Sequence, residues 1–202
     1  MNWIKDGTTL KGEVALLLPL EEKHFSELNE VAKEKRIWEF HPIDMSTDEK
    51  RLIAFSKALE EREKGSQFPF VIFHQEDKRI IGSTRLMDIH SIHRKLEIGW
   101  TWLHPDYWAT AVNLACKLLL LSFAFEELKA LRVQLKTDEN NIRSRKAIAK
   151  IGGQFEGILR NDMLRDNGTS RNSVYFSLLD TEWQGAKINL QGLLQQKLKN
   201  SF

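Results

Sequence analysis

Near the middle of the chain the sequence reads Leu96-Glu97-Ile98-Gly99-Trp100-Thr101-Trp102-Leu103-His104-Pro105-Asp106-Tyr107-Trp108-Ala109-Thr110-Ala111-Val112-Asn113. Apolar and polar residues alternate in its first half, and this period of two predicts a β-strand over residues 95–103. The residues predicted to share one face of that strand are Leu96, Ile98, Trp100 and Trp102. From Trp108 to Leu128 most residues are apolar, which predicts a long helix buried against a sheet. The stretch therefore predicts a strand that enters a buried helix through a loop of small residues.

Upstream of this stretch, short apolar runs and polar helical patterns follow one another. The predicted elements are a strand over 12–20, helices over 22–34 and 47–64, and a hairpin of strands over 68–74 and 79–89. Pro19 ends the first strand, and Ser46 with Glu49 has the spacing of a capping box for the second helix. With the strand over 95–103, the hairpin makes three successive antiparallel strands.

Downstream, strands and helices alternate. The predicted elements are a strand over 131–137, a helix over 141–151, a closing hairpin of strands over 155–160 and 173–179, and a helix over 181–198. Gly152-Gly153 is a helix stop signal, and Asn167-Gly168 is a strong turn signal for the hairpin.

This order of elements fits neither a doubly wound nor an all-antiparallel fold. It predicts an α/β (α+β) fold with a mixed, mostly antiparallel central sheet and helices on both faces. A chain of 202 residues is long enough to bury its own core. We therefore expect one domain over residues 1–202, with a core at about 12–183 and a helical tail at 184–202.

Composition and charge exclude several classes of partner. The 30 basic and 28 acidic residues are interspersed and leave a net charge of only +2, so we expect no nucleic-acid or membrane partner. The N-terminus lacks the pattern of an export signal, which favours a cytoplasmic location. Cys116 is the only cysteine and the histidines lack metal-ligand spacing, so we expect no metal site. The histidines considered are His41, His90, His93 and His104.

The loop before the buried helix has a geometry that can bind phosphate. Backbone amides at the start of a helix have no partner within the helix, and the helix dipole favours an anion there. The small residues Ala109, Thr110 and Ala111 would let a phosphate approach the backbone. An ordinary strand-to-helix loop has the same pattern, so the residues alone leave both interpretations open.

Two further motifs carry a family resemblance. They are Leu131-Arg132-Val133-Gln134-Leu135-Lys136-Thr137-Asp138-Glu139-Asn140-Asn141-Ile142-Arg143-Ser144-Arg145-Lys146-Ala147 and Ile151-Gly152-Gly153-Gln154-Phe155-Glu156-Gly157. From about Gly12 to Trp183 the chain resembles the RimJ/RimL branch of the GNAT acetyltransferases. The most specific part is Asn-x-x-Ser-x-x-Ala followed by Gly-x-x-Phe-Glu-Gly.

The resemblance implies acetyl-coenzyme A (acetyl-CoA) as co-substrate. In such a fold two central strands, here 95–103 and 131–137, splay apart, and the pantetheine arm lies between them. The implied cofactor contacts are Trp102, Leu103, Trp108, Ala109, Thr110, Ala111, Val112, Asn113, Asn141 and Ser144. Asn141 is also an ordinary N-cap candidate.

One part of the loop departs from the family pattern. The family usually has Gln or Arg, two residues, then Gly-x-Gly or Gly-x-Ala, whereas this chain has Asp106 and then Ala109-Thr110-Ala111. If Ala109 requires a positive φ, the strain of about 1–2 kcal/mol would weaken cofactor affinity by roughly tenfold.

Three residues are candidates for the chemistry. The resemblance implies that the Ser144 hydroxyl donates a proton to the leaving thiolate; the alternative is a solvent-facing helix serine. Glu97 lies among apolar neighbours, where burial would raise its pKa toward that of a useful base, but a paired structural glutamate fits equally. RimL-type enzymes place an acidic base in the last hairpin, where Asp162 is the candidate and Met163 the alternative in register.

The expected function is transfer of an acetyl group from acetyl-CoA to a primary amine, either a protein N-terminus or a small molecule. The alternative is a non-catalytic acetyl-CoA-binding or interaction module that retains the fold. Neither the acceptor amine nor the choice between monomer and homodimer follows from the sequence.

Overall fold

The protein is described by a computed structural model over residues 3–200. Within that range one mixed sheet has eight strands in the order β1-β2-β3-β4-β5-β6-β8-β7. Neighbouring strands are antiparallel except β5 and β6, which confirms the predicted mixed, mostly antiparallel sheet. The strands are β1 Leu10–Lys11, β2 Ala15–Pro19, β3 Phe68–His74, β4 Arg79–His90, β5 Lys95–Leu103, β6 Arg132–Asp138, β7 Gln154–Leu164 and β8 Ser170–Leu179.

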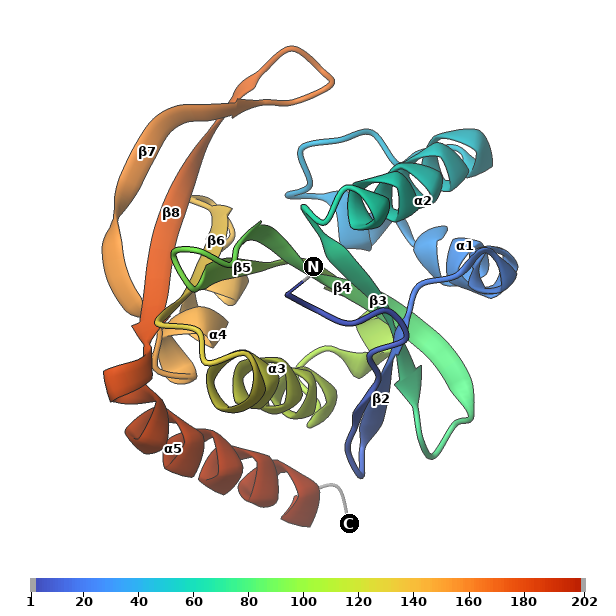
Figure 1. The fold of residues 1–202 in the computed structure, drawn as a ribbon. Helices are drawn as coiled ribbons and strands as arrows, with labels where there is room; N and C mark the ends of the chain where they lie inside the picture. The colour runs from blue at the N-terminus through green and yellow to red at the C-terminus, as the bar shows by residue number, and fades with distance from the viewer. Residues whose placement is uncertain (1–2, 201–202) are drawn as a thin grey trace.

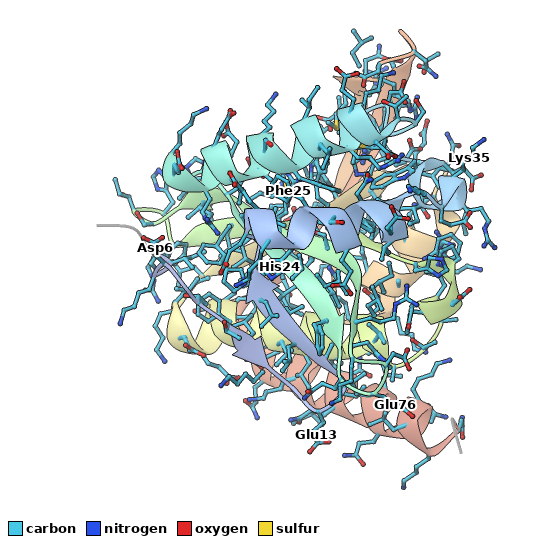
Figure 2. All side chains as sticks on the ribbon, turned by 90° about the vertical axis from the view of Figure 1, so that its right-hand side faces the viewer. Asp6, Glu13, His24, Phe25, Lys35 and Glu76 are labelled. Atoms are coloured by element: carbon cyan, nitrogen blue, oxygen red, sulfur yellow. The ribbon has the colours of Figure 1, made fainter. Side chains whose placement is uncertain are left out.

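Helices cover both faces of this sheet, as predicted (Figure 1). The helices are α1 Phe25–Ala32, α2 Asp48–Glu63, α3 Val112–Ser122, α4 Ile142–Lys150 and α5 Asp180–Lys199. One apolar core lies between the sheet and α3, α4 and α5, and a second lies between the sheet and α1 and α2. Figure 2 shows α1, which begins at Phe25, beside α2 on this second face.

A β-bulge interrupts β5. Trp102 pairs with Ser83 of β4, but Gly99 pairs with Arg85, so two residues of β5 lie opposite one residue of β4. One of these two residues, Trp100, has a φ of +49°, a left-handed conformation that is rare for a bulky side chain. The strand therefore bends and twists at this point.

The bulge also reverses the faces of β5. Leu96 and Ile98 enter the core under α3, whereas Trp102 enters the core under α1 and α2. Because an extra residue shifts the two-residue alternation by one, side chains after the bulge point to the opposite face. The prediction that Trp102 shares one face with Leu96 and Ile98 is wrong.

β5 and β6 are the only parallel neighbours among residues 3–200, and they soon separate. Three residue pairs join them, the last being Glu97 with Gln134, although β5 continues to Leu103 and β6 to Asp138. This separation confirms the two splayed central strands. Beyond it, each strand has an edge whose backbone groups lack a strand partner.

The helix predicted from Trp108 begins later than expected. A 3-10 turn spans Pro105–Tyr107, and α3 starts only at Val112. Trp108 has an extended ψ of 143° and Ala109 a φ of +61°, so neither residue is helical. Beyond α3 the chain continues as a π-helical turn over Phe123–Glu127.

Other boundaries differ from the predictions for local reasons. Thr47, not Ser46, caps α2 by accepting a hydrogen bond from the Lys50 amide at 3.2 Å. The helix predicted over 22–34 is broken, because 3-10 turns precede and follow α1. The last hairpin is longer than predicted and turns at Gly168, whose φ is +82°.

α5 packs along α3 (Figure 1). Trp183 stacks on Phe125 at a centroid distance of 5.4 Å, and its Nε1 donates to Glu126 Oε1 at 2.7 Å. Leu190 is fully buried against the same core. Of the predicted tail 184–202, residues 201–202 lie outside the described residues.

Gly82→Ala should lower the free energy of unfolding by about 2–3 kcal/mol. A Cβ at Gly82 would lie 2.1 Å from the Trp102 carbonyl oxygen and 3.0 Å from Leu103 Cα, both backbone atoms at the bulge. The measurement is urea unfolding followed by circular dichroism.

Gly185→Ala in α5 is the matched control. Nothing lies within 4 Å of the Cβ position there, so the variant should gain about 0.5–1 kcal/mol from helix propensity. Equal stability of the two variants would contradict the tight β4–β5 contact.

Candidate functional site

A pocket of about 540 Å³ lies where β5 and β6 separate. Its walls come from both strands, the loop before α3, α3, α4, the β7–β8 hairpin and a segment over residues 37–42. The sequence-predicted residues that line it are Glu97, Trp102, Leu103, Trp108, Ala109, Thr110, Asn113, Asn141 and Ser144. Ala111 and Val112 are buried and do not line it, and Met163 lines it instead of Asp162. The Asp162 carboxylate instead accepts a hydrogen bond from the Tyr175 hydroxyl at 3.1 Å.

The start of α3 offers several backbone amides to this pocket. Thr110 Oγ1 accepts from the Val112 amide at 3.3 Å, and the N-cap residue Ala111 has no side chain that could accept from the other amides. Among residues 3–200 no acceptor is found for the amides of Ala109, Thr110, Ala111, Asn113 and Leu114. Free amides at a helix N-terminus, reinforced by the helix dipole, bind anions such as phosphate.

The loop side chains modify this anion site. Ala109 has a φ of +61°, the left-handed conformation that is strained for alanine, so the folded loop itself carries this strain. Asp106 is exposed beside His104 and does not line the pocket. At the pocket wall the Arg143 guanidinium lies 3.6 Å from the centroid of the Trp108 ring, which places a positive charge near the free amides.

Glu97 lies at the last residue pair before β5 and β6 separate. It is 1% exposed, its Oε2 accepts from Gln134 Nε2 at 2.7 Å, and Lys136 Nζ lies 3.5 Å from the same oxygen. Its other oxygen, Oε1, accepts no hydrogen bond from the described residues. Burial raises the pKa of Glu97, opposed by Lys136 and Gln134. Glu97 is thus both a paired glutamate and a carboxylate with one oxygen available to take a proton.

Asn141 and Ser144 form the start of α4 as predicted. Asn141 Oδ1 accepts from the Ser144 amide at 3.0 Å, which is an N-cap hydrogen bond. Ser144 is half-buried on the pocket wall, and its hydroxyl makes no hydrogen bond within the described part of the chain. That hydroxyl is therefore free to donate to a ligand.

Sequence reasoning missed Lys117. It is 6% exposed in α3, lines the pocket, and its Nζ donates to Thr101 Oγ1 at 3.0 Å. Burial lowers the pKa of this amine to about 8. A lysine inside the apolar stretch from Val112 to Phe125 was the available signal, because lysine is rarely buried without a reason.

His41 was noted in the sequence only as one of several scattered histidines. In the structure its ring lies edge-on to Trp100, at a centroid distance of 4.4 Å, and to Trp38 at 5.1 Å. Its Nδ1 is buried without a hydrogen-bond partner among the described residues. Burial, with the charges of Arg85 and Arg171, lowers the pKa of His41 to about 3, so the ring is neutral.

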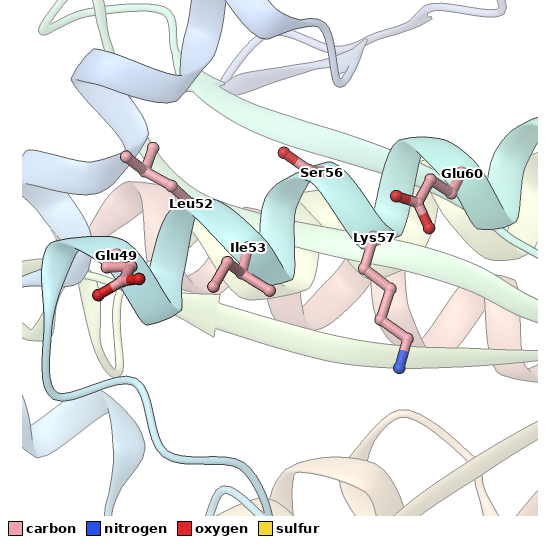
Figure 3. Close-up of a pocket in the computed structure, with 6 residues that line it drawn as sticks. All are labelled: Glu49, Leu52, Ile53, Ser56, Lys57 and Glu60. Atoms are coloured by element: carbon pink, nitrogen blue, oxygen red, sulfur yellow. The ribbon is translucent and has the colours of Figure 1, made fainter.

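A second, more open depression lies on α2 (Figure 3). Its lining residues are Glu49, Leu52, Ile53, Ser56, Lys57 and Glu60. All six belong to one helix, and Leu52 and Ile53 are 39% and 60% exposed. Because polar groups from several elements converge only in the sheet pocket, the candidate site is there.

The family follows from the sequence comparison. The profile of the acetyltransferase (GNAT) domain matches residues 15–154. The chain belongs to the GNAT acetyltransferase family. Over 111 residues this GNAT acetyltransferase is 35% identical to a Bacillus subtilis protein provisionally named ribosomal N-acetyltransferase YdaF, covering 55% of this chain and 60% of that protein.

Solved structures agree with the family. A provisionally assigned acetyltransferase from T. thermophilus superposes on this GNAT acetyltransferase with a TM-score of 0.83 at 29% identity, covering 92% of this chain and 96% of the other. Mycobacterium smegmatis RimJ, solved with CoA-disulfide, superposes with a TM-score of 0.80 over 93% of this chain and 95% of the other. At 19% identity the second likeness concerns the fold alone.

Within residues 3–200 of this GNAT acetyltransferase, none of the helices has the length and apolarity needed to cross a bilayer. In the same range no three His, Cys, Asp or Glu side chains are grouped to bind a metal ion.

Lys117→Met should stabilise the protein below pH 8, because methionine fills the site without a buried charge. The pKa of Lys117 is about 8 in the fold and 10.5 ordinarily, so between these values the unfolded chain binds the extra proton. Wild-type stability should therefore rise from pH 8 to 10.5, and the advantage of the variant should shrink. Urea unfolding at pH 7 and pH 10 measures this.

Lys57→Met, at an exposed position on α2, is the control and should show no such trend. A stability difference for Lys117→Met that is the same at both pH values would show that the buried charge is not its cause.

Proposed function

We propose that this protein transfers the acetyl group of acetyl-CoA to a primary amine, on a protein N-terminus or a small molecule. The observation that carries the proposal is one pocket that joins the free amides of α3 to the Glu97 carboxylate and the Ser144 hydroxyl. The family supports acetyl transfer in general. Membership alone does not identify the donor or the acceptor.

The residues present fit CoA. The free amides at the start of α3, with Arg143 beside Trp108, would hold the pyrophosphate. The separated edges of β5 and β6 offer backbone donors and acceptors to the amides of the pantetheine arm. RimJ, which shares the fold, was solved with a CoA disulfide, and this supports the same ligand class here.

The chemistry requires a neutral amine, an activated acyl group and a stabilised leaving sulfur. The thioester supplies the activated acyl group. Glu97 Oε1 would accept the proton of the amine, directly or through water, and its raised pKa improves it as a base. The Ser144 hydroxyl would donate to the departing sulfur. Asn141 is a positioning residue, because its cap hydrogen bond fixes the first turn of α4.

Other sequence predictions stay predictions. These are the single domain over 1–202, the absence of nucleic-acid and membrane partners, the choice of monomer or homodimer, and the cytoplasmic location. Asp162 also stays a candidate only, and it does not line the pocket.

Ser144→Ala and Glu97→Gln should separate the two proposed roles. Loss of the hydroxyl should lower kcat by about ten- to a hundredfold across the pH range, with the Kd of CoA unchanged. Loss of the carboxylate should lower kcat and abolish the fall in rate at acidic pH, since the base works only when deprotonated. A thiol-release assay with an amine panel measures both.

Ser56→Ala on α2 is the control for both variants. Parental turnover in Ser144→Ala would remove that residue from the mechanism. Binding of CoA by the wild type without turnover of any amine would favour a non-catalytic module.

Ala109→Gly should change the Kd of CoA by no more than about threefold, because the strained φ is a feature of the folded loop. Calorimetry with CoA gives the Kd. A tenfold gain in affinity would mean that the alanine methyl, or strain that arises on binding, opposes the cofactor.

A further inference from the structure

One end of the pocket, here called the acceptor end, is enclosed by segments far apart in the sequence. It is lined by Ile37, Phe40, His41, Pro42, Trp100, Met163 and Arg171. The tip of the β7–β8 hairpin is tied to the loop opposite: the Asp166 amide donates to the Pro42 carbonyl at 3.1 Å, and the Asp44 amide donates to Asp166 Oδ2 at 2.6 Å. These bonds hold the hairpin against the 37–42 loop.

Unpaired polar atoms are concentrated at this end. Within residues 3–200 the buried side-chain atoms without a hydrogen-bond partner are His41 Nδ1, Arg171 Nε and Ser173 Oγ. His41 and Arg171 belong to the acceptor end, and Ser173 follows Arg171 by two residues on β8. A buried polar group left unpaired costs about 1–3 kcal/mol, so native proteins contain few of them. Two such atoms on one pocket wall, His41 Nδ1 and Arg171 Nε, point to a ligand group that supplies their missing hydrogen-bond partners.

Of the two residues, Arg171 is the stronger indication of a ligand group. It is 7% exposed, and its guanidinium donates no hydrogen bond to any residue that the structure describes. Asp138 Oδ2 lies 3.8 Å from Nε, beyond hydrogen-bond distance, and that carboxylate already accepts from Arg165 and from the Asn140 amide. A planar guanidinium with free donors matches the two oxygens of a carboxylate.

The charges closest to His41 also favour an anion. Over the whole acceptor end the charged groups balance: Arg85, Arg165 and Arg171 are positive, and Glu97, Asp138 and Asp162 are negative. The charged groups that act on His41, however, are the two guanidinium groups of Arg85 and Arg171, and Arg85 lies over the Trp100 ring at 4.4 Å. A cationic ligand group beside His41 would be disfavoured and an anion attracted.

We propose that the acceptor is a small molecule that carries a carboxylate near its amine, and that Arg171, assisted by His41, binds this carboxylate. The substrate class is therefore amino-acid-like. A polyamine lacks the carboxylate, and a protein N-terminus presents a neutral carbonyl at the same place. The proposal rests on the proposed function only for the amine, because the carboxylate site can be tested without turnover.

Binding of product analogues provides the test. N-acetyl-L-amino acids and their amides, titrated in the presence of CoA, differ only in the carboxylate, and the pocket tryptophans report binding by fluorescence. The acids should bind wild type at least about tenfold more tightly than the amides, the range of a charge-assisted hydrogen bond. Equal affinities in wild type would overturn the proposal whether or not any variant folds.

Variants of Arg171 locate the effect. Arg171→Gln should abolish the preference for the acids, and Arg171→Lys, which keeps the charge without the fork, should retain only part of it. Arg160→Gln, an exposed position on the same hairpin that does not line the pocket, should keep the full preference. A preference that survives Arg171→Gln would show that another residue binds the carboxylate.

Turnover distinguishes this inference from the proposed function. In the thiol-release assay free amino acids should react faster than their amides and the corresponding decarboxylated amines. If the amides or the decarboxylated amines react as fast as the free amino acids, acetyl transfer is retained and the carboxylate site is rejected. Selective binding of the acids without turnover of any amine would retain the carboxylate site and reject acetyl transfer.

Discussion

The separation of two parallel strands is the constraint on which the site depends. β5 and β6 stop pairing after Glu97 and Gln134, and the backbone beyond that point gives up ladder hydrogen bonds that a continuous sheet would make. The residues of β5 just beyond this point are closely packed: a Cβ at Gly99 would lie 2.6 Å from Met87 Sδ and 2.9 Å from Glu97 Oε1. The pocket lies at this one break, with Glu97 in its wall and the loop before α3 beside it.

The pocket contains features that the rest of the fold must stabilise. Trp100 and Ala109 have positive φ values, and Lys117 and Arg171 are cations buried without a carboxylate in hydrogen-bond contact. Each feature is unfavourable for folding, and such features are typical of binding and catalytic sites. The two apolar cores on either face of the sheet hold the pocket walls in place.

Much of the fold was predictable from patterns that are local in the sequence. Alternation over 95–103 and the N-cap at Asn141 correctly predicted a strand and a helix start. The bulge at Trp100 was not predictable, because it depends on register against β4, and the late start of α3 depends on the non-helical conformation of Ala109. For the candidate site, the sequence named loop and motif residues that line the pocket, but His41 and Arg171 are 130 positions apart in the numbering and meet only through tertiary folding.

The contact between α5 and α3 has a consequence for synthesis of the protein. The face of α3 under Trp183, Ala186 and Leu190 is covered by α5, which leaves the ribosome after all eight strands of the sheet. Until residues 180–199 emerge, that apolar face lacks the cover that α5 provides. A nascent chain stalled before this helix would expose apolar surface beside a nearly complete sheet, which is the kind of intermediate that chaperones bind and proteases degrade.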